Sequence, residues 1–354
     1  MRKYSLFFLL LSALLPLQAA SPTFTVGWSI YVGWNPYFYM AKSGILKRWA
    51  EKYNVDIKVQ RFDYAPSLDA FVAKNIDACT MTNMEALDMP AASGVDTTAI
   101  IVGDFSNGND AVMVRNNLSF AQLPGKQVML VQKTVSEYLF ERGMVMNGQQ
   151  SELKKVKLLN TSDSDIVGAF MNNPSSQAVV TWKPLVSQIR SVKGVTTIFD
   201  SSKIPGEILD LLVVRTDILN RPDGSGARFA KAMTGAWFET LSQLAAKGAT
   251  GDKAAAGVAA ASGDTLASIR EQLSTTHMFY QPASAVEFTV SSDLKQKMEL
   301  VRQFCFRHGL LGENSASVDD VAIQFPDKSV AGKKDRVRLR FDAGYMQMAA
   351  GGKL

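Results

Sequence analysis

The chain contains 354 residues, with 38 Lys and Arg against 33 Asp and Glu and a formal net charge of +5. Two of the basic residues lie within the first three positions. Without them the excess is only +3, which argues against nucleic acid as a partner. Only two His and two Cys occur, and neither His has a Cys, Asp or Glu at metal-ligand spacing. We therefore expect no metal site and no cofactor.

The first twenty residues predict a cleaved secretory leader. Arg2 and Lys3 give a basic start, residues 6–17 give an apolar core, and residues 17–20 end in two alanines. The core is too short to span a bilayer, and no later segment reaches the ~18 uninterrupted apolar residues that a membrane helix needs. No Cys follows the core, so we expect no lipid anchor. The leader therefore predicts a soluble periplasmic protein.

Half of the twelve residues from 28 to 39 are aromatic, where the composition of the chain predicts about one. The run lies between a predicted strand, 23–30, and a predicted helix, 37–53, and Gly33, Asn35 and Pro36 interrupt it. We expect this turn at the C-terminal edge of a parallel sheet, where open α/β sheets bind ligands. Aromatic faces at that edge suit a small, flat or cationic solute.

Strands and helices alternate in the first hundred residues. Strands are predicted at 55–62, 77–81 and 97–102, and a helix at 66–74. Thr82-Asn83-Met84-Glu85 has the pattern of a capping box for the next helix. This order predicts a first α/β lobe with a mostly parallel sheet.

A second α/β pattern begins at residue 111. Its strands are predicted at 111–114, 127–131, 155–159, 177–181 and 196–199, and its helices from 134 and over 163–171. A further strand is predicted at 211–214, followed by helices at 234–244, 247–263, 264–273, 291–307 and 318–323. The basic stretch 333–340 is expected to be an edge strand or a solvated face. We expect lobe I to comprise 21–110 and 211–354 and lobe II to comprise 111–210. The chain would cross twice at a hinge, which suits solute capture.

Motifs of catalysis are missing from the sequence. No Gly-x-Ser-x-Gly elbow, phosphate-binding loop or Gly-x-Gly-x-x-Gly turn occurs. His308 is expected at a helix C-terminus. Cys79 and Cys305 stand among apolar residues, so two buried thiols are favoured over a disulfide. These features favour binding over catalysis.

Several segments resemble the nitrate/taurine/sulfonate-type solute-binding proteins of ABC transporters. They are Tyr31-Val32-Gly33-Trp34-Asn35-Pro36, Ala41-Lys42-Ser43-Gly44-Ile45-Leu46, Ile76-Asp77-Ala78-Cys79-Thr80 and Ala178-Val179-Val180-Thr181-Trp182-Lys183-Pro184. Residues 103–110 and 341–348 are similar to the branch associated with urea carboxylase operons. The resemblance implies a type II periplasmic binding fold, with two doubly wound mixed sheets flanked by helices. It also implies an inner-membrane ABC permease with its ATPase as partner, and urea or guanidine as solute. We expect a monomer.

The start of the helix at 134 bears on the charge of the solute. By the resemblance, binders of sulfonate or nitrate offer an open helix N-terminus in lobe II, where backbone amides hold the oxyanion. Thr134-Val135-Ser136-Glu137 has the pattern of a capping box, so Glu137 would put a negative charge there. This favours a guanidinium or a neutral urea over an anion.

Ten residues are candidate solute contacts, each with a structural alternative. Aromatic and polar side chains at predicted strand ends stand first, because ligands bind there. Turns, caps and core packing are the alternatives for these residues, and Lys183 is an alternative partner for the two hinge carboxylates. The candidates are Trp34, Asn35, Asp63, Thr80, Asn83, Asp104, Glu137, Trp182, Glu207 and Asp210.

Two other functions stay open. The same class of protein would serve for a sulfonate, nitrate or a thiamine-precursor pyrimidine. An enzyme that shares the fold, such as a pyrimidine synthase, would need a reactive side chain in the cleft, and Cys79 is the candidate for it.

Overall fold

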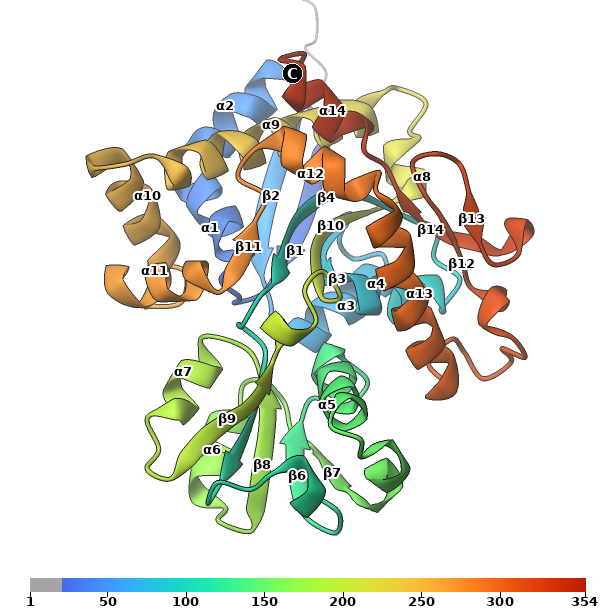
Figure 1. Cartoon of the computed structure of the whole chain (residues 1–354). Helices are drawn as coiled ribbons and strands as arrows, with labels where there is room; N and C mark the ends of the chain where they lie inside the picture. The colour runs from blue at the N-terminus through green and yellow to red at the C-terminus, as the bar shows by residue number, and fades with distance from the viewer. Residues whose placement is uncertain (1–20) are drawn as a thin grey trace, which may run out of the picture.

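The computed structural model describes residues 21–354, so the predicted leader lies outside the described residues. Two mixed sheets organise the chain, one above the other in Figure 1. The sheet of lobe I runs β13 (Val330–Ala331), β12 (Ala322–Gln324), β14 (Val337–Phe341), β4 (Thr97–Ser106), β10 (Leu209–Arg215), β3 (Ala78–Thr82), β1 (Thr23–Trp28) and β2 (Asp56–Arg61), with β11 (Thr276–Met278) paired to β4. The sheet of lobe II runs β7 (Lys157–Asn160), β6 (Gln127–Leu130), β8 (Ser176–Thr181), β5 (Ala111–Arg115) and β9 (Val195–Asp200).

Helices cover both sheets. Those of lobe I are α1 (Asn35–Lys42), α2 (Ile45–Lys52), α3 (Tyr64–Val72), α4 (Asn83–Ala86), α8 (Thr216–Leu219), α9 (Ser225–Ala245), α10 (Ala249–Ala259), α11 (Leu266–Ser274), α12 (Pro282–Thr289), α13 (Ser292–Arg307) and α14 (Gly344–Ala350). Those of lobe II are α5 (Val135–Met146), α6 (Ile166–Asn172) and α7 (Leu185–Arg190). This architecture confirms the predicted α/β fold class. No helix of residues 21–354 is both long and apolar enough to span a membrane.

The chain passes between the two sheets twice, after β4 and again before β10. Hydroxyl groups tie these two passages together. Ser201 Oγ lies 2.6 Å from Ser106 Oγ and accepts from the backbone N–H of Gly108 at 2.7 Å. β10 then pairs antiparallel with both β3 and β4, which places Asp210 between these two strands in the middle of the sheet of lobe I.

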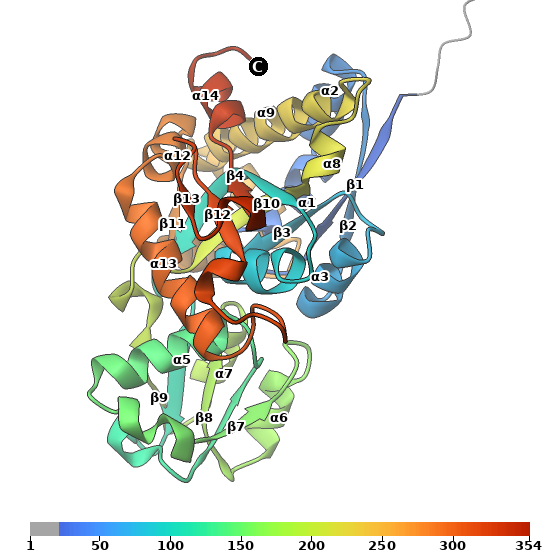
Figure 2. The same cartoon turned by 90° about the vertical axis from the view of Figure 1, so that its right-hand side faces the viewer.

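The two lobes also meet away from the hinge. Figure 2 shows α13 of lobe I beside α5 of lobe II. Phe304 and Tyr138 pack edge to face there, with ring centroids 5.2 Å apart. The structure is therefore a closed arrangement of the lobes, in which side chains of one lobe contact the other.

Three predicted elements differ in the structure. The helix at 37–53 is two helices, because Gly44 takes the left-handed region at φ +80° between α1 and α2. The segment 318–323 is a short 3-10 turn followed by β12. The basic stretch is exposed over 333–336, which fits the predicted solvated face. It is not an edge strand, because β14 lies between β12 and β4 with Leu339 fully buried and Arg340 paired with Asp96.

Candidate functional site

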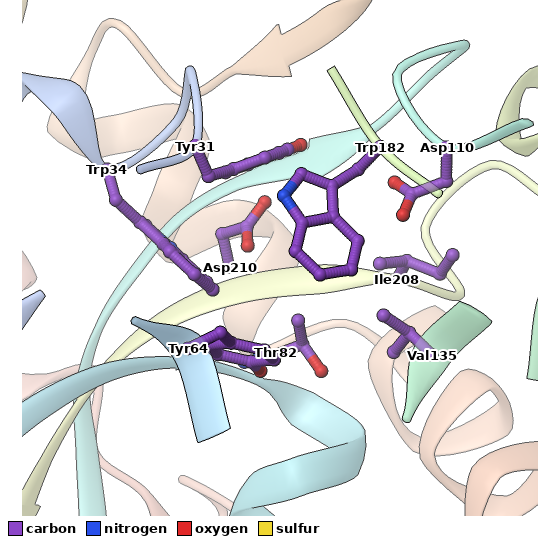
Figure 3. A pocket seen from close by; sticks show the side chains of 9 residues that line it. All are labelled: Tyr31, Trp34, Tyr64, Thr82, Asp110, Val135, Trp182, Ile208 and Asp210. Carbon is purple, nitrogen blue, oxygen red and sulfur yellow. The ribbon is translucent and has the colours of Figure 1, made fainter. Parts of the chain in front are cut away.

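A pocket lies between the lobes (Figure 3). Its volume is about 20 Å³, counted as the space open to the centre of a water molecule. On the same measure one water needs roughly 10–15 Å³, so the closed arrangement admits only a small solute. The pocket is lined by Tyr31, Trp34, Tyr64, Thr82, Asp110, Val135, Trp182, Ile208 and Asp210.

Four aromatic rings form one wall of this cleft pocket. Trp34 lies 5.2 Å from Tyr31 and 5.2 Å from Tyr64, measured between ring centroids. Tyr64 of lobe I meets Trp182 of lobe II at 6.0 Å and an interplanar angle of 73°. The indole Nε1 of Trp34 is buried and has no hydrogen-bond partner among the described residues. The wall therefore spans both lobes and offers faces to a flat or cationic solute.

Two carboxylates stand opposite each other on neighbouring strands, and one of them, Asp210, lines the pocket. Asp210 on β10 is the register partner of Asp104 on β4, and both are buried. Asp104 Oδ1 and Oδ2 and Asp210 Oδ2 accept no hydrogen bond within residues 21–354. Gly33 makes room for Asp104, because a Cβ at position 33 would lie 2.6 Å from Asp104 Oδ2.

Burial decides the protonation of these acids. It raises the pKa of Asp104 to about 7. Burial and the neighbouring Asp104 raise the pKa of Asp210 well above its usual range. Burial also raises the pKa of Asp110 to about 7, although the Ser106 hydroxyl donates to its carboxylate. Near neutral pH Asp110 and Asp104 are thus at the edge of ionisation, and Asp210 holds its proton more strongly than an ordinary Asp. No basic side chain is among the nine lining residues.

The N-terminus of α5 reaches the pocket at Val135. The N-cap Thr134 accepts from the Ser136 N–H, while Glu137 accepts from the Lys133 N–H at 2.8 Å. The Val135 N–H donates instead to Glu85 Oε1 of lobe I at 3.0 Å. The Glu137 carboxylate thus turns back at the helix start, to the N–H of Lys133 rather than to that of the predicted cap residue Thr134, and a second carboxylate, that of Glu85, bonds the first helical N–H. The predicted capping box of α4 is wrong, because α4 has no side-chain cap and the Thr82 hydroxyl donates to Glu85.

Three predicted contact residues line the pocket, and others lie close behind it. Trp34, Trp182 and Asp210 line it, and Asp104 is the partner of Asp210 behind the wall. Thr80 lies on β3 with its hydroxyl buried and unpartnered among the described residues, but it does not line the pocket.

Two other predictions from the lobe I turns fall outside the pocket. Asn35 begins α1 and donates to Ser262 Oγ at 3.3 Å. Asp63 stands before α3 and lines a separate hollow together with Trp182 and Asp163. Both residues therefore belong to the surroundings of the aromatic turn rather than to the pocket wall.

Two polar candidates at the hinge have partners within the chain. Asn83 accepts from the Leu209 N–H and donates to the Glu207 carbonyl, both at 3.0 Å. The Glu207 carboxylate binds Arg142 at 2.8 and 3.0 Å and accepts from the Tyr138 hydroxyl. The structure therefore gives Glu207 a guanidinium partner within the chain, and neither a solute nor Lys183 is needed to pair it.

A group of charged side chains joins the lobes outside the pocket. Glu137, a predicted contact, lies 3.3 Å from His308 Nδ1, and Glu141 lies 2.6 Å from His308 Nε2. His308 is the C-cap residue of α13, as predicted. Its bonds to Glu137 and Glu141 raise the pKa of His308 to about 9. Lys183 pairs with Glu271 at 2.6 Å.

Six lining residues were not among the predicted contacts. Tyr31 belongs to the aromatic run, which is a signal that points to it, and Tyr64 directly follows Asp63. Asp110 lies where the chain passes between the lobes, and its role depends on the closed hinge. The residues not predicted are Tyr31, Tyr64, Thr82, Asp110, Val135 and Ile208.

Cys79 does not form a reactive centre. Both cysteines are buried free thiols, as predicted. Cys79 lies on β3 without exposure, and burial raises the pKa of its thiol to about 12. Residues 21–354 hold no group of three or more His, Cys, Asp or Glu that fits a metal ion.

Solved structures provide the comparison, because no protein-family model and no curated protein matches the sequence. The alkanesulfonate-binding protein SsuA of Xanthomonas axonopodis pv. citri, bound to MOPS, superposes with a TM-score of 0.64 at 14% identity, over 83% of this chain and 96% of that chain. The periplasmic aliphatic sulphonate-binding protein SsuA of Escherichia coli gives 0.63 at 17% identity, over 82% and 94%. The fold is that of a periplasmic binding protein. The desulfurization enzyme DSZB also superposes, at 0.55 and 13% identity over 83% and 95%. Function must therefore be argued from the site.

Proposed function

We propose that this protein is the solute-binding component of an ABC importer and that its cleft captures a small, planar, nitrogen-rich cation of the guanidinium class. The observation that carries the proposal is the buried pair Asp104 and Asp210, which has unpartnered oxygens beside an aromatic wall. On this proposal the protein works in the periplasm as a monomer and delivers its solute to an inner-membrane permease with its ATPase. Lobe II (111–210) would close on lobe I (21–110 and 211–354).

The free-energy cost of burying two neighbouring carboxylates favours a cation as the solute. Two neighbouring buried carboxylates are costly, because they can ionise together only against each other's charge, and such a pair is tolerated when a cation or a shared proton compensates it. A guanidinium offers paired N–H donors that match one carboxylate, as an arginine head does. Asp210 faces the pocket and is the group that would accept them.

The aromatic wall supports the planar shape. A cation over an indole or phenol face gains about 0.5–2 kcal/mol, more when water is excluded. Trp34 comes from lobe I and Trp182 from lobe II, so a solute that contacts both favours the closed arrangement.

Two of the neighbours named above are binding proteins for alkanesulfonates or aliphatic sulphonates, and a sulfonate is the solute to expect if the likeness in fold extended to the ligand. The charges of this cleft pocket oppose it. None of its nine lining residues is basic, three acidic groups lie in or behind it, and Glu85 occupies the Val135 N–H. An anion entering this space would meet like charge.

One observation favours urea as a second candidate. The Trp34 indole N–H is a buried donor without an acceptor among the described residues. Guanidinium has no acceptor to offer, whereas urea has a carbonyl oxygen and four N–H donors. Urea would bind when the carboxylate pair carries a proton.

Calorimetric titration at pH 7 separates these solutes. The mature protein is unfolded in urea-free conditions by acid, dialysed and refolded to remove retained solute, and then titrated with guanidinium, urea and taurine. The proposal predicts saturable heat with guanidinium and none with taurine. Saturation by taurine alone would remove the cation from consideration, and saturation by urea alone would favour the second candidate.

A further inference from the structure

A carboxylate of lobe I lies on the first turn of a helix in lobe II. Glu85 of α4 is buried, and its Oε1 accepts from the backbone N–H of Val135, the first residue of the twelve-residue helix α5. Its Oε2 accepts from the Thr82 hydroxyl, whose residue lines the cleft pocket together with Val135. The bond from Glu85 to Val135 therefore closes one side of the pocket across the two lobes.

The first turn of a helix attracts negative charge, because its N–H groups are free and the helix dipole is positive there. In α5 the Ser136 N–H is satisfied by Thr134, and the Val135 N–H is satisfied by Glu85. The Ser136 hydroxyl is almost fully buried and has no partner among the described residues. Without the Glu85 side chain, the N–H of the lining residue Val135 would also lose its partner, next in the chain to this unpartnered hydroxyl.

We infer that Glu85 is a specificity-determining residue: its carboxylate occupies the anion position at the start of α5 and so excludes anionic solutes from the cleft. This inference deepens the proposed function and rests on it for the sign of the natural solute. The chemical class that Glu85 excludes is that of small oxyanions, such as sulfonates. An oxygen of Glu85 fills the position in either protonation state, so the exclusion has a steric part as well as an electrostatic part.

Substitution of Glu85 tests the inference by a gain of binding. Glu85→Ala removes the occupant, and Glu85→Ser does so with a smaller change in polarity in case the alanine variant does not fold. Glu85→Gln keeps an oxygen that accepts from Val135. Glu137→Ala is the matched control, because it removes a carboxylate from the same helix turn and leaves the Val135 N–H bonded. Far-UV circular dichroism and thermal melting establish that each variant is folded.

Methanesulfonate is the probe, titrated by calorimetry at pH 7 into each refolded protein. We expect Glu85→Ala or Glu85→Ser to bind it at least about tenfold more tightly than the wild-type protein, which corresponds to about 1.4 kcal/mol. Glu85→Gln and Glu137→Ala should stay at the wild-type level. A folded Glu85→Ala or Glu85→Ser variant without this gain, or a wild-type protein that already binds methanesulfonate as tightly, would overturn the inference.

Titration of guanidinium into the wild-type protein tests the proposed function independently of the role of Glu85. If guanidinium fails to bind but the Glu85 variants gain methanesulfonate, the cation proposal fails while Glu85 keeps its role. If guanidinium binds but no variant gains methanesulfonate, the cation proposal stands and the role of Glu85 fails.

Discussion

Neutralising Asp210 should have opposite effects on the stability and on the affinity of the protein. Asp210 faces the cleft pocket, with one oxygen unpartnered and Asp104 opposite it. Removal of a carboxylate that stabilises the fold would lower the stability of the protein. A buried carboxylate whose role is to bind a cation destabilises the solute-free protein, and its removal should therefore raise the stability of that form.

The structure gives the order of magnitude of both effects. Burial moves the pKa of Asp104 from 3.8 to about 7. A raised pKa of this size means that ionisation of the carboxyl group destabilises the native state by roughly 4 kcal/mol. This destabilisation is fully present at pH values above the pKa of the folded protein and absent below the pKa of the unfolded chain. Asp210→Asn removes the neighbouring acid that shares the cost of burial with Asp104, so we expect the free protein to gain on the order of 1–4 kcal/mol at pH 8. Loss of a buried partner of the cation costs about 2–5 kcal/mol, or at least about 30-fold in affinity.

Thermal melting and calorimetry measure the two effects on the same samples. For Asp210→Asn we expect the Tm of the solute-free protein to rise by a few degrees at pH 8 and by less at pH 5, where the carboxyl group is already protonated. Glu207→Gln is the control, because Glu207 is buried near the same hinge but paired with Arg142. This control should lower the Tm. A fall in Tm for Asp210→Asn with unchanged guanidinium affinity would refute the reasoning, since it would make Asp210 a structural residue.

Three further predictions concern the wall, the pH and the lobe contact. Trp182→Ala removes an aromatic face from lobe II and should weaken guanidinium binding by about 1–2 kcal/mol, roughly 5- to 30-fold by calorimetry. Guanidinium affinity should fall about tenfold per unit as the pH drops below 7, because burial raises the pKa of Asp104 to about 7 and the pair attracts the cation only when this one proton is lost. His308→Gln should open the solute-free protein, measured as a larger radius of gyration by small-angle X-ray scattering at pH 7. In the wild-type protein the contact of His308 with Glu141 is fully present below about pH 6.5 and is lost as the pH rises through about 9.

Each of these predictions has a result that contradicts it. Unchanged affinity in Trp182→Ala would make this ring a packing residue. An affinity that is flat between pH 5 and pH 8 would exclude the carboxylate pair from the binding step and would favour a neutral solute. An unchanged radius of gyration for His308→Gln would mean that the other contacts hold the lobes closed. The other histidine, His277 on β11, provides the control His277→Gln for the loss of a histidine as such.

Local patterns in the sequence predicted the elements and part of the pocket. The alternation of strands and helices and the aromatic turn at Trp34 depend on neighbours in the chain, and the structure contains both. Trp182 was predicted because it ends a strand, where the sheet topology places ligands, and Asp210 because a buried carboxylate at the hinge needs a partner.

Pairings between distant residues could not be predicted from local patterns. Thr82 and Glu85 have the spacing of a capping box, but tertiary structure draws Glu85 to a helix 50 residues away. The carboxylate of Glu207 forms a salt bridge with Arg142 in lobe II. The spacing of residues along the chain does not contain these contacts, which arise only when the two lobes meet.

A crystal structure of the refolded protein grown with guanidinium tests the central claim most directly. We predict planar density in the cleft pocket, stacked on Trp182 or Trp34 and within hydrogen-bond distance of Asp210, with Glu85 still bonded to the Val135 N–H. An empty pocket at saturating guanidinium, or an anion bound at the start of α5 in the wild-type protein, would contradict the account.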